Sequence, residues 1–557
     1  CIFITLYTFT SFVCCLQNAD LSSIPDNVTF LKFNFDVNLF DYDFPNRGVI
    51  VGGKDVLYAL TVDNLGHRIH LHWISNKIDK VSCELRGKPT SLCNNYLRVY
   101  QPLKHSNYKQ IFICGTNSFK PICRSYKYPD LKMLKEYHEF GLSPNDPRVS
   151  VVYNYGNNNN DLYVATIAGS SASDALIIRP FSKVRTQRFN DRIFNSPQFI
   201  KAVSVENRML FFFRELAFER NFAPVSRIAR ICENDNGGNA SFKSIFTTFR
   251  KTTIHCSVKR KNARPIVLHN LTSVSEITVK LISGNKYSSF YASFTGKELS
   301  ESRKIFFVSA VCHFSLNDII DNFDKAVIGY RRPGSPLEAI TFEQKINDYV
   351  DVDRSNRNRK AAIRNLDPCE FKLSEAAQRF NMDHTLTSYI AEDMNALKGS
   401  SPFFVYFHES VSLTFIYDHE IKLNFGNVTL AYIGTSDGRV MKVFETASKQ
   451  HNFQSELQVF PSDTAVKHIF LTSKDWCNMS AKVVVFSNNS MRVFNVTNCE
   501  LVKTCKECVG SKDPYCFWNI SGNQCMRSCN PEQNNDIIQN LLTGDDRRCE
   551  EIDKKGS

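Results

Sequence analysis

Short apolar runs separated by polar turns make up most of the chain before residue 498. Residues 48–60, 428–446 and 481–497 each contain two apolar segments around a turn, built on Gly-Gly-Lys-Asp, Asp437-Gly438 and Asn-Asn. This pattern is typical of β-hairpins, and its repetition predicts a sandwich, a barrel or a propeller. Because a propeller grows by adding blades, the length of the region favours a propeller.

Residues 315–329 and residues 130–141 instead carry apolar side chains at helical spacing. The first segment begins at a Ser cap, and the second places Leu134 and Phe140 on one side and ends at Gly141. We expect both segments to be helices that pack their apolar sides against the sheets.

Cysteine density divides the chain into two parts. Nine cysteines lie between residues 16 and 498, whereas seven lie between Cys499 and Cys549. A large first part is able to bury its own core, but a part of about fifty residues needs covalent cross-links. We therefore predict a β domain over residues 25–498, a cysteine-rich domain over 499–550 and a tail over 551–557.

The N-terminus predicts export. Residues 2–16 are almost all apolar or hydroxylic, which fits a secretory signal over residues 1–17 whose start is missing; a buried strand is the alternative. Without Cys1, Cys14 and Cys15, 16 of the 19 cysteines remain, an even number that suits disulfides. The expected location is extracellular, with a membrane anchor only if the natural chain continues beyond residue 557. Eight glycosylation sequons agree with this route: Asn27, Asn239, Asn270, Asn427, Asn478, Asn488, Asn495 and Asn519.

The charge balance points to acidic partners. The chain carries a formal net charge of +12, and its basic residues are spread along the sequence. This excess suits an acidic protein or a glycan-rich matrix, and we find no motif for binding nucleic acid.

Catalytic motifs are missing from the sequence. We find no nucleophile elbow, Walker loop, dinucleotide-binding glycine motif or paired-histidine zinc motif, and we expect neither an enzyme nor a cofactor. A propeller glycosidase remains an alternative, because its two acids come from distant strands and leave no local motif. The stretch CKECVGSKDPYCFW at 505–518 taken alone fits a redox thiol pair, a zinc knuckle or a disulfide module.

Several blocks resemble the semaphorin family in the family's order. They are CNNYLRVY (93–100), ICGTNSFKPIC (113–123), MLFFFRELAFER (209–220), SRIARICENDNGG (226–238), TTFRKTTIHC (247–256) and YIGTSDGRVMKVF (432–444). The stretch at 505–518 resembles the PSI module that follows the sema domain in this family. One departure is Phe246, where the family usually has Trp.

The resemblance implies an all-β fold, a seven-bladed sema-type propeller followed by a PSI domain. It also implies a disulfide scheme that sends Cys505 and Cys508 to different partners, so that they would not form a redox pair. The expected pairs are Cys83–Cys93, Cys114–Cys123, Cys232–Cys369, Cys256–Cys312, Cys499–Cys516, Cys505–Cys549 and Cys508–Cys525. Cys477 and Cys529 are left over, and we expect them to pair with each other.

Semaphorins are signalling ligands, so the resemblance implies a homodimer that brings two plexin receptors together in cell or axon guidance. An alternative is the ectodomain of a plexin-like receptor, which shares the sema–PSI pair. The basic loop 179–192 is our candidate receptor contact, and a solvated loop is the competing interpretation. A second basic run at 259–264 is a candidate for heparan sulfate, against ordinary surface. The candidate receptor-contact residues are Arg179, Lys183, Arg185, Arg188 and Arg192.

Overall fold

The computed structural model describes most of the chain between residues 29 and 556. The described residues are 29–43, 48–62, 67–104, 109–128, 130–169, 171–238, 242–260, 263–282, 285–299, 303–328, 339–341, 369, 378, 382, 385, 402–423, 426–446, 451–473, 481–527 and 536–556. The predicted signal segment, the sequons Asn27, Asn239 and Asn478, and the cysteines Cys477 and Cys529 lie outside them.

Four antiparallel sheets follow one another over the first half of the chain. Blade 1 contains β2 (Leu39–Asp43), β3 (Gly48–Gly52), β4 (Val56–Thr61) and β5 (His67–His72). Blade 2 contains β6 (Leu97–Lys104), β7 (Lys109–Gly115), β8 (Ile122–Tyr128) and β9 (Lys132–Tyr137). Blade 3 contains β10 (Val151–Tyr155), β11 (Leu162–Ala168), β12 (Asp174–Arg179) and β13 (Val184–Arg185). Blade 4 contains β14 (Gln198–Val205), β15 (Arg208–Ala217), β16 (Ala223–Cys232) and β17 (Arg250–Ile254), with the short helix η4 (Phe218–Arg220) between β15 and β16.

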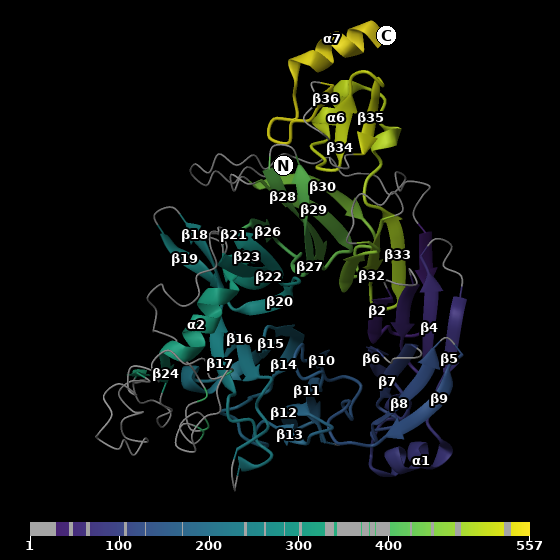
Figure 1. The fold of residues 1–557 in the computed structure, drawn as a ribbon, viewed down its shortest axis with the longest axis vertical. Coiled ribbons are helices and arrows are strands. Elements are labelled where there is room, and N and C mark those ends of the chain that lie inside the picture. Colours follow the sequence, from purple (N-terminus) through teal and green to yellow (C-terminus); the bar gives the residue numbers. More distant parts are fainter. Residues whose placement is uncertain are drawn as a thin grey trace.

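Three more sheets complete a ring of seven blades (Figure 1). Blade 5 contains β20 (Asn270–Val274), β21 (Thr278–Ile282), β22 (Asn285–Leu299), β23 (Ile305–Ser315) and β26 (Phe404–His408). Blade 6 contains β27 (Leu413–Leu423), β28 (Gly426–Thr435), β29 (Arg439–Glu445) and β30 (His451–Gln458). Blade 7 contains β31 (His468–Leu471), β32 (Lys482–Phe486), β33 (Ser490–Asn495) and, on its outer edge, β1 (Thr29–Lys32) from the start of the chain. Thr29 lies opposite Val493, so the first strand closes the last blade.

The hydrophobic core lies between the blades rather than within one central layer. Seven buried clusters each join one neighbouring pair of blades, including the pair formed by blades 7 and 1. Successive side chains of a strand point to opposite faces of its sheet. Because both faces of a blade carry apolar side chains, neighbouring blades pack face to face. This ring of interfaces is the seven-bladed propeller that the family resemblance implied.

The three hairpins predicted from turn chemistry are confirmed: β3 pairs with β4, β28 with β29 and β32 with β33. At the middle turn, Gly438 has a φ of 80°, a conformation that suits glycine. The helix predicted over 315–329 is also present as α2 (Leu316–Lys325), and the Ser315 hydroxyl accepts a hydrogen bond from the Asp318 N–H.

The helix predicted over 130–141 is wrong. Residues 132–137 of this segment form β9, the outer strand of blade 2, because the backbone of β8 supplies hydrogen-bonding partners along its length. Leu134 and Phe140 are 41% and 45% exposed, so they are surface residues rather than a core stripe. Helical spacing over so short a segment does not outweigh pairing at a sheet edge.

Short elements decorate the propeller between its blades. Helix α1 (Lys77–Leu85) and η3 (Thr90–Leu92) join blades 1 and 2, and the hairpin β18 (Cys256–Arg260) and β19 (Ala263–Leu268) joins blades 4 and 5. Strands β24 (Ala326–Ile328) and β25 (Ala339–Thr341) pair after α2. The disulfide Cys232–Cys369 ties a residue between β25 and β26 to blade 4.

The cysteine-rich domain follows blade 7 and lies beside blade 6 (Figure 1). It contains η6 (Cys499–Leu501), α6 (Cys505–Gly510), β34 (Cys516–Asn519), β35 (Gln524–Arg527), β36 (Ile537–Ile538) and α7 (Arg547–Gly556). Helix α7 continues past residue 550 into the segment that the sequence suggested was a tail. There, the Asp553 carboxylate accepts hydrogen bonds from the N–H groups of Cys505 and Lys506 at the start of α6.

Candidate interaction surface

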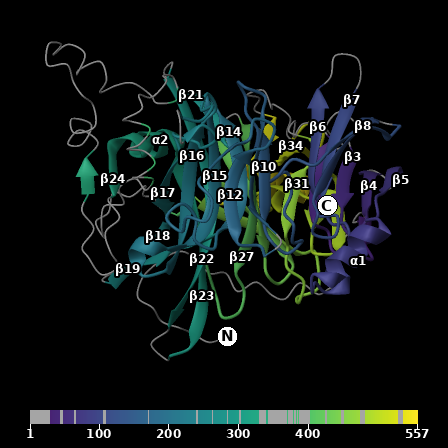
Figure 2. The same cartoon turned by 90° about the horizontal axis from the view of Figure 1, so that it is seen from below.

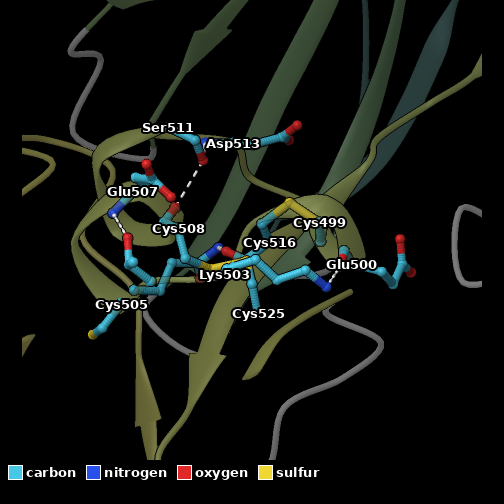
Figure 3. The surroundings of a disulfide bond; sticks show 12 residues. Cys499, Glu500, Lys503, Cys505, Glu507, Cys508, Ser511, Asp513, Cys516 and Cys525 are labelled. Carbon is cyan, nitrogen blue, oxygen red and sulfur yellow. Dashed lines mark hydrogen bonds between the residues drawn. A yellow bond between two sulfur atoms is a disulfide. The ribbon is translucent and has the colours of Figure 1, made fainter. Parts of the chain in front are cut away.

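Seven disulfides bind the described cysteines together, and the pairs are those that the family resemblance implied. They are Cys83–Cys93, Cys114–Cys123, Cys232–Cys369, Cys256–Cys312, Cys499–Cys516, Cys505–Cys549 and Cys508–Cys525. In Figure 3, Cys505 and Cys508 lie on one helix and Cys499 bonds to Cys516 beside it. Since Cys505 and Cys508 have different partners, the Cys-x-x-Cys stretch is a structural cross-link rather than a redox thiol pair.

Arg179, the first residue of the candidate basic loop, is buried and acts inside the fold. Only 1% of it is exposed, and its guanidinium donates to the Asp235 carbonyl, the Asn236 side chain and the Ser182 hydroxyl. Arg179 therefore connects blade 3 to the loop after β16. A buried guanidinium with these partners is not available to a receptor, so its assignment as a contact residue is wrong.

The remaining candidates differ in how they are held. Lys183 and Arg192 are exposed, whereas Arg185 is half-buried in β13. The backbone of Arg185 is bonded on both sides, since its N–H donates to the Ser244 carbonyl and its own carbonyl accepts from the Phe246 N–H. Phe246 is itself buried and stacks on Tyr163, so this phenylalanine fills a core position.

Arg188 lies at the centre of a small surface cluster at the seam between blades 2 and 3. Its Nε donates to Asp174 Oδ2 at 2.6 Å, and the Asp174 side chain is almost completely buried. The guanidinium lies 4.8 Å from the ring centre of Phe140 and 5.0 Å from that of Phe189. We call Phe140, Asp174, Arg188 and Phe189 the Arg188 cluster.

The Arg188 cluster exposes apolar surface that a soluble protein normally covers. Phe189 is 70% exposed and Phe140 45%, and Phe181 on the same seam is 42% exposed. An arginine fixed between two aromatic rings loses little side-chain freedom when a partner binds, and Arg and aromatic residues dominate the binding energy of protein interfaces. The cluster can therefore serve as an anchor for another protein.

Sequence reasoning missed the aromatic part of this site. Phe140 was assigned to the core side of a helix, and Phe189 was not singled out. The available signal was a phenylalanine inside the polar, basic segment RTQRFNDR, where burial has no local support.

The described sequons lie in blades 5 to 7 and in the cysteine-rich domain. Asn427, Asn488 and Asn495 are exposed, and Asn270 and Asn519 are partly exposed. Glycosylation at these five positions stays a prediction.

Two further features are absent from the residues that the structure describes. In this part of the chain, no three His, Cys, Asp or Glu side chains are grouped so as to hold a metal ion. None of the helices described is both long enough and apolar enough to cross a bilayer.

Comparison with known proteins adds to these observations. The model of the Sema domain matches residues 271–473, and the model of the plexin repeat, named PSI, matches residues 498–550. The solved structure of Drosophila Semaphorin 1b, extracellular domains 1–2, is 28% identical, with a TM-score of 0.76 over 93% of this chain and 96% of that one. The chain belongs to the semaphorin family. Semaphorin-1A of Schistocerca americana is 28% identical over 90% of this semaphorin, which spans 67% of that relative.

Plexin ectodomains resemble this semaphorin in fold alone. Plexin A4 is 17% identical with a TM-score of 0.58, below the values for Semaphorin 1b. The alternative of a receptor fragment is therefore not favoured.

Proposed function

We propose that this semaphorin is an extracellular ligand of a plexin ectodomain and that it acts by binding rather than by catalysis. The observation that carries the proposal is its likeness to Semaphorin 1b, whose structure has been solved in complex with Drosophila Plexin A. That chain is 28% identical and has a TM-score of 0.75 over 93% of this chain. A homodimer that gathers two receptors, to control cell or axon guidance, completes the proposal.

The Arg188 cluster is the proposed receptor contact. Arg188 and Phe189 lie in the basic segment that the sequence singled out, and the cluster combines an exposed aromatic surface with a fixed cation. Such a surface suits a receptor patch with apolar pockets and an acidic rim.

The test requires a variant that removes contact surface without disturbing the fold. Replacing Arg188 would leave Asp174 buried without its ion pair, so Phe189→Ser is the better choice. Phe222→Ser is a matched control, because Phe222 is also exposed and, like Phe189, has a positive φ, 62° against 52°.

Surface plasmon resonance on a panel of immobilised plexin ectodomains, including Drosophila Plexin A, gives the readout. We expect Phe189→Ser to weaken binding at least tenfold and Phe222→Ser to leave it unchanged. Equal binding by both variants would exclude the Arg188 cluster as the contact. A wild-type protein that binds no plexin would exclude the function itself.

Dimerisation is measured separately, by light scattering coupled to size-exclusion chromatography. A mass of two chains at micromolar concentration supports the homodimer. A mass of one chain at every accessible concentration would remove dimerisation from the proposal while leaving plexin binding open to the test above.

A further inference from the structure

The hairpin β18–β19 lies beside the hairpin β22–β23, which belongs to blade 5. The hairpin β18–β19 contacts β22 and β23, and the disulfide Cys256–Cys312 joins it covalently to β23. Gly296 marks the closest approach, because a Cβ at this position would lie 2.9 Å from the Leu268 side chain. In Figure 2, the β22–β23 hairpin projects from the body of the propeller near β18 and β19.

The outer ends of both hairpins carry exposed basic side chains, which we call the two-hairpin basic surface. Its members are Lys259, Arg260, Arg264, Lys297, Arg303 and Lys304. Along the described parts of these four strands the only acidic residue is Glu298, and Glu409 follows the adjacent strand β26. Among the described residues, the sequence run 259–264 therefore supplies three of these six cations.

The geometry sets the size of the surface. Five residues separate Leu268 from the turn of β18–β19, and five separate Val308, which lies opposite Gly296, from Arg303. At about 3.3 Å per residue, both tips lie within roughly 17 Å of the contact between Leu268 and Gly296. One extended ligand can reach both tips, whereas a compact anion reaches only one.

The first hairpin, which carries three of the cations, is anchored in the hydrophobic core. Val258 and Ile266 of the first hairpin are buried in the core shared by blades 4 and 5. Arg260 Nε donates to the Arg264 carbonyl at 2.9 Å, and Lys297 Nζ lies 5.2 Å from the ring centre of Phe307. Among the described residues, Lys259, Arg260, Arg264, Lys297 and Arg303 form no ion pair, unlike Arg188.

We propose that the two-hairpin basic surface binds a sulfated glycosaminoglycan of the heparan sulfate type. Such a chain is linear and carries sulfate and carboxylate groups along its length, which matches cations spread over two tips. Ammonium and guanidinium groups form charge-assisted hydrogen bonds with such oxyanions. The binding is independent of the plexin contact proposed above, because it uses blade 5 rather than the seam between blades 2 and 3.

Heparin-affinity chromatography of the folded chain tests the proposal. The first variant is Lys259→Ser/Arg260→Ser, the second is Arg303→Ser/Lys304→Ser, and the third combines all four changes. The matched control, Lys503→Ser/Lys506→Ser, removes two exposed charges from the PSI domain. All changes are at exposed positions, and thermal unfolding checks that each variant is folded.

We expect the wild-type protein to stay bound at about 0.15 M NaCl, the ionic strength of physiological fluid. Each hairpin variant should elute at lower salt, and the fourfold variant should not be retained. The slope of log affinity against log salt should fall by roughly one for each cation removed. The PSI control should elute with the wild type.

Several outcomes would overturn the proposal. They are a wild-type protein that is not retained, a PSI control that shifts as far as the hairpin variants, and an effect confined to one hairpin. Competition tests the ligand class: a heparin dodecasaccharide should displace the protein, and a disaccharide or polyglutamate of equal charge should not. Displacement by polyglutamate would indicate an acidic protein partner instead.

Discussion

Lys442 of blade 6 and Asp513 of the PSI domain form an ion pair across the junction between the two domains. Lys442 Nζ lies 2.7 Å from Asp513 Oδ2, and each side chain is only 9% exposed. The Lys442 ammonium also lies 4.7 Å from the ring centre of Tyr515, whose hydroxyl lies 2.6 Å from His419 Nε2 of blade 6. The Asp-Pro-Tyr-Cys stretch therefore attaches the PSI domain to the propeller.

Lys442→Met should lower the free energy of unfolding by about 3 kcal/mol, because it leaves the Asp513 carboxylate buried without its cation. Urea unfolding at neutral pH measures the change. Lys422→Met, at an exposed position on β27, is the control and should have little effect. Adding Asp513→Asn to Lys442→Met should recover most of the loss. If Lys442→Met is as stable as Lys422→Met, the ion pair does not hold the junction.

Asp418→Asn should stabilise the protein at neutral pH. Burial raises the pKa of Asp418 to about 6, from an ordinary value of 3.8, against the attraction of Lys201. Because the folded-state pKa is the higher one, the stabilisation from protonated Asp418 is complete below 3.8 and is lost as the pH rises through 6. The neutral amide of Asn does not ionise and so keeps this stabilisation at every pH. We therefore expect Asp418→Asn to raise the free energy of unfolding by about 3 kcal/mol at pH 7.5 and by roughly half of that at pH 5.

Urea unfolding of Asp418→Asn and the wild type at pH 7.5 and pH 5 tests this dependence. A gain that is the same at both pH values would show that the titration of Asp418 is not its cause.

Mild acid should destabilise the propeller through two buried histidines. Burial lowers the pKa of both His468 and His419 to about 3, and the charges of Lys201 and Lys442, respectively, act in the same direction. A histidine with a lowered pKa in the folded state stabilises the protein fully above pH 6.5, and this stabilisation is lost as the pH falls. At pH 5 the loss in the free energy of unfolding is about 2 kcal/mol per histidine. Thermal unfolding between pH 7.5 and pH 5 measures the loss.

His468 is the better histidine to replace, since it lies between the rings of Phe40 and Phe415, at 4.2 and 4.4 Å. His468→Phe keeps an aromatic ring in place and should weaken the pH dependence. His138→Phe, at a position that is 61% exposed, should leave it unchanged. An unaltered pH dependence in His468→Phe would contradict the assignment.

Cys508→Ser/Cys525→Ser should destabilise the PSI domain by about 3 kcal/mol, because the bond closes a loop with a sequence separation of 17 residues. Scanning calorimetry should show the loss, and Cys83→Ser/Cys93→Ser provides a comparison within the propeller. Peptide mapping of the wild type should recover Cys505 joined to Cys549. A peptide with Cys505 joined to Cys508, or zinc in the purified protein, would contradict the scheme.

Local patterns in the sequence were enough to predict hairpins, but not whether a segment forms the edge strand of a sheet. A hairpin is defined by its own turn and two adjacent apolar runs, as in β28–β29. Residues 132–137 instead take their conformation from pairing with β8, and Met133, Leu134 and Phe140 in the segment 130–141 are exposed. Nothing within those twelve residues distinguishes such an edge strand from a short helix.

Which charged side chains are buried and which are exposed was even harder to predict from the sequence. Arg179 looks like its basic neighbours, but its partners Asp235 and Asn236 lie 56 and 57 residues further along the chain. The same limit hid the two-hairpin basic surface, where Lys259, Arg260 and Arg264 lie on one hairpin and Lys297, Arg303 and Lys304 on another that packs against it. Composition predicts that a loop is basic, whereas tertiary packing decides which of its cations reach the solvent.

The pairing of β1 with β33 places a constraint on biosynthesis. The strand that contains Thr29 is synthesised first, and it can pair in blade 7 only after Val493 has been synthesised. More than four hundred residues separate the two positions. At the usual 5–20 residues per second, the ribosome needs roughly half a minute to a minute and a half to deliver the partner. During that interval the N-terminal strand has an unpaired edge, and a chain that stops short of β33 is left with an open ring.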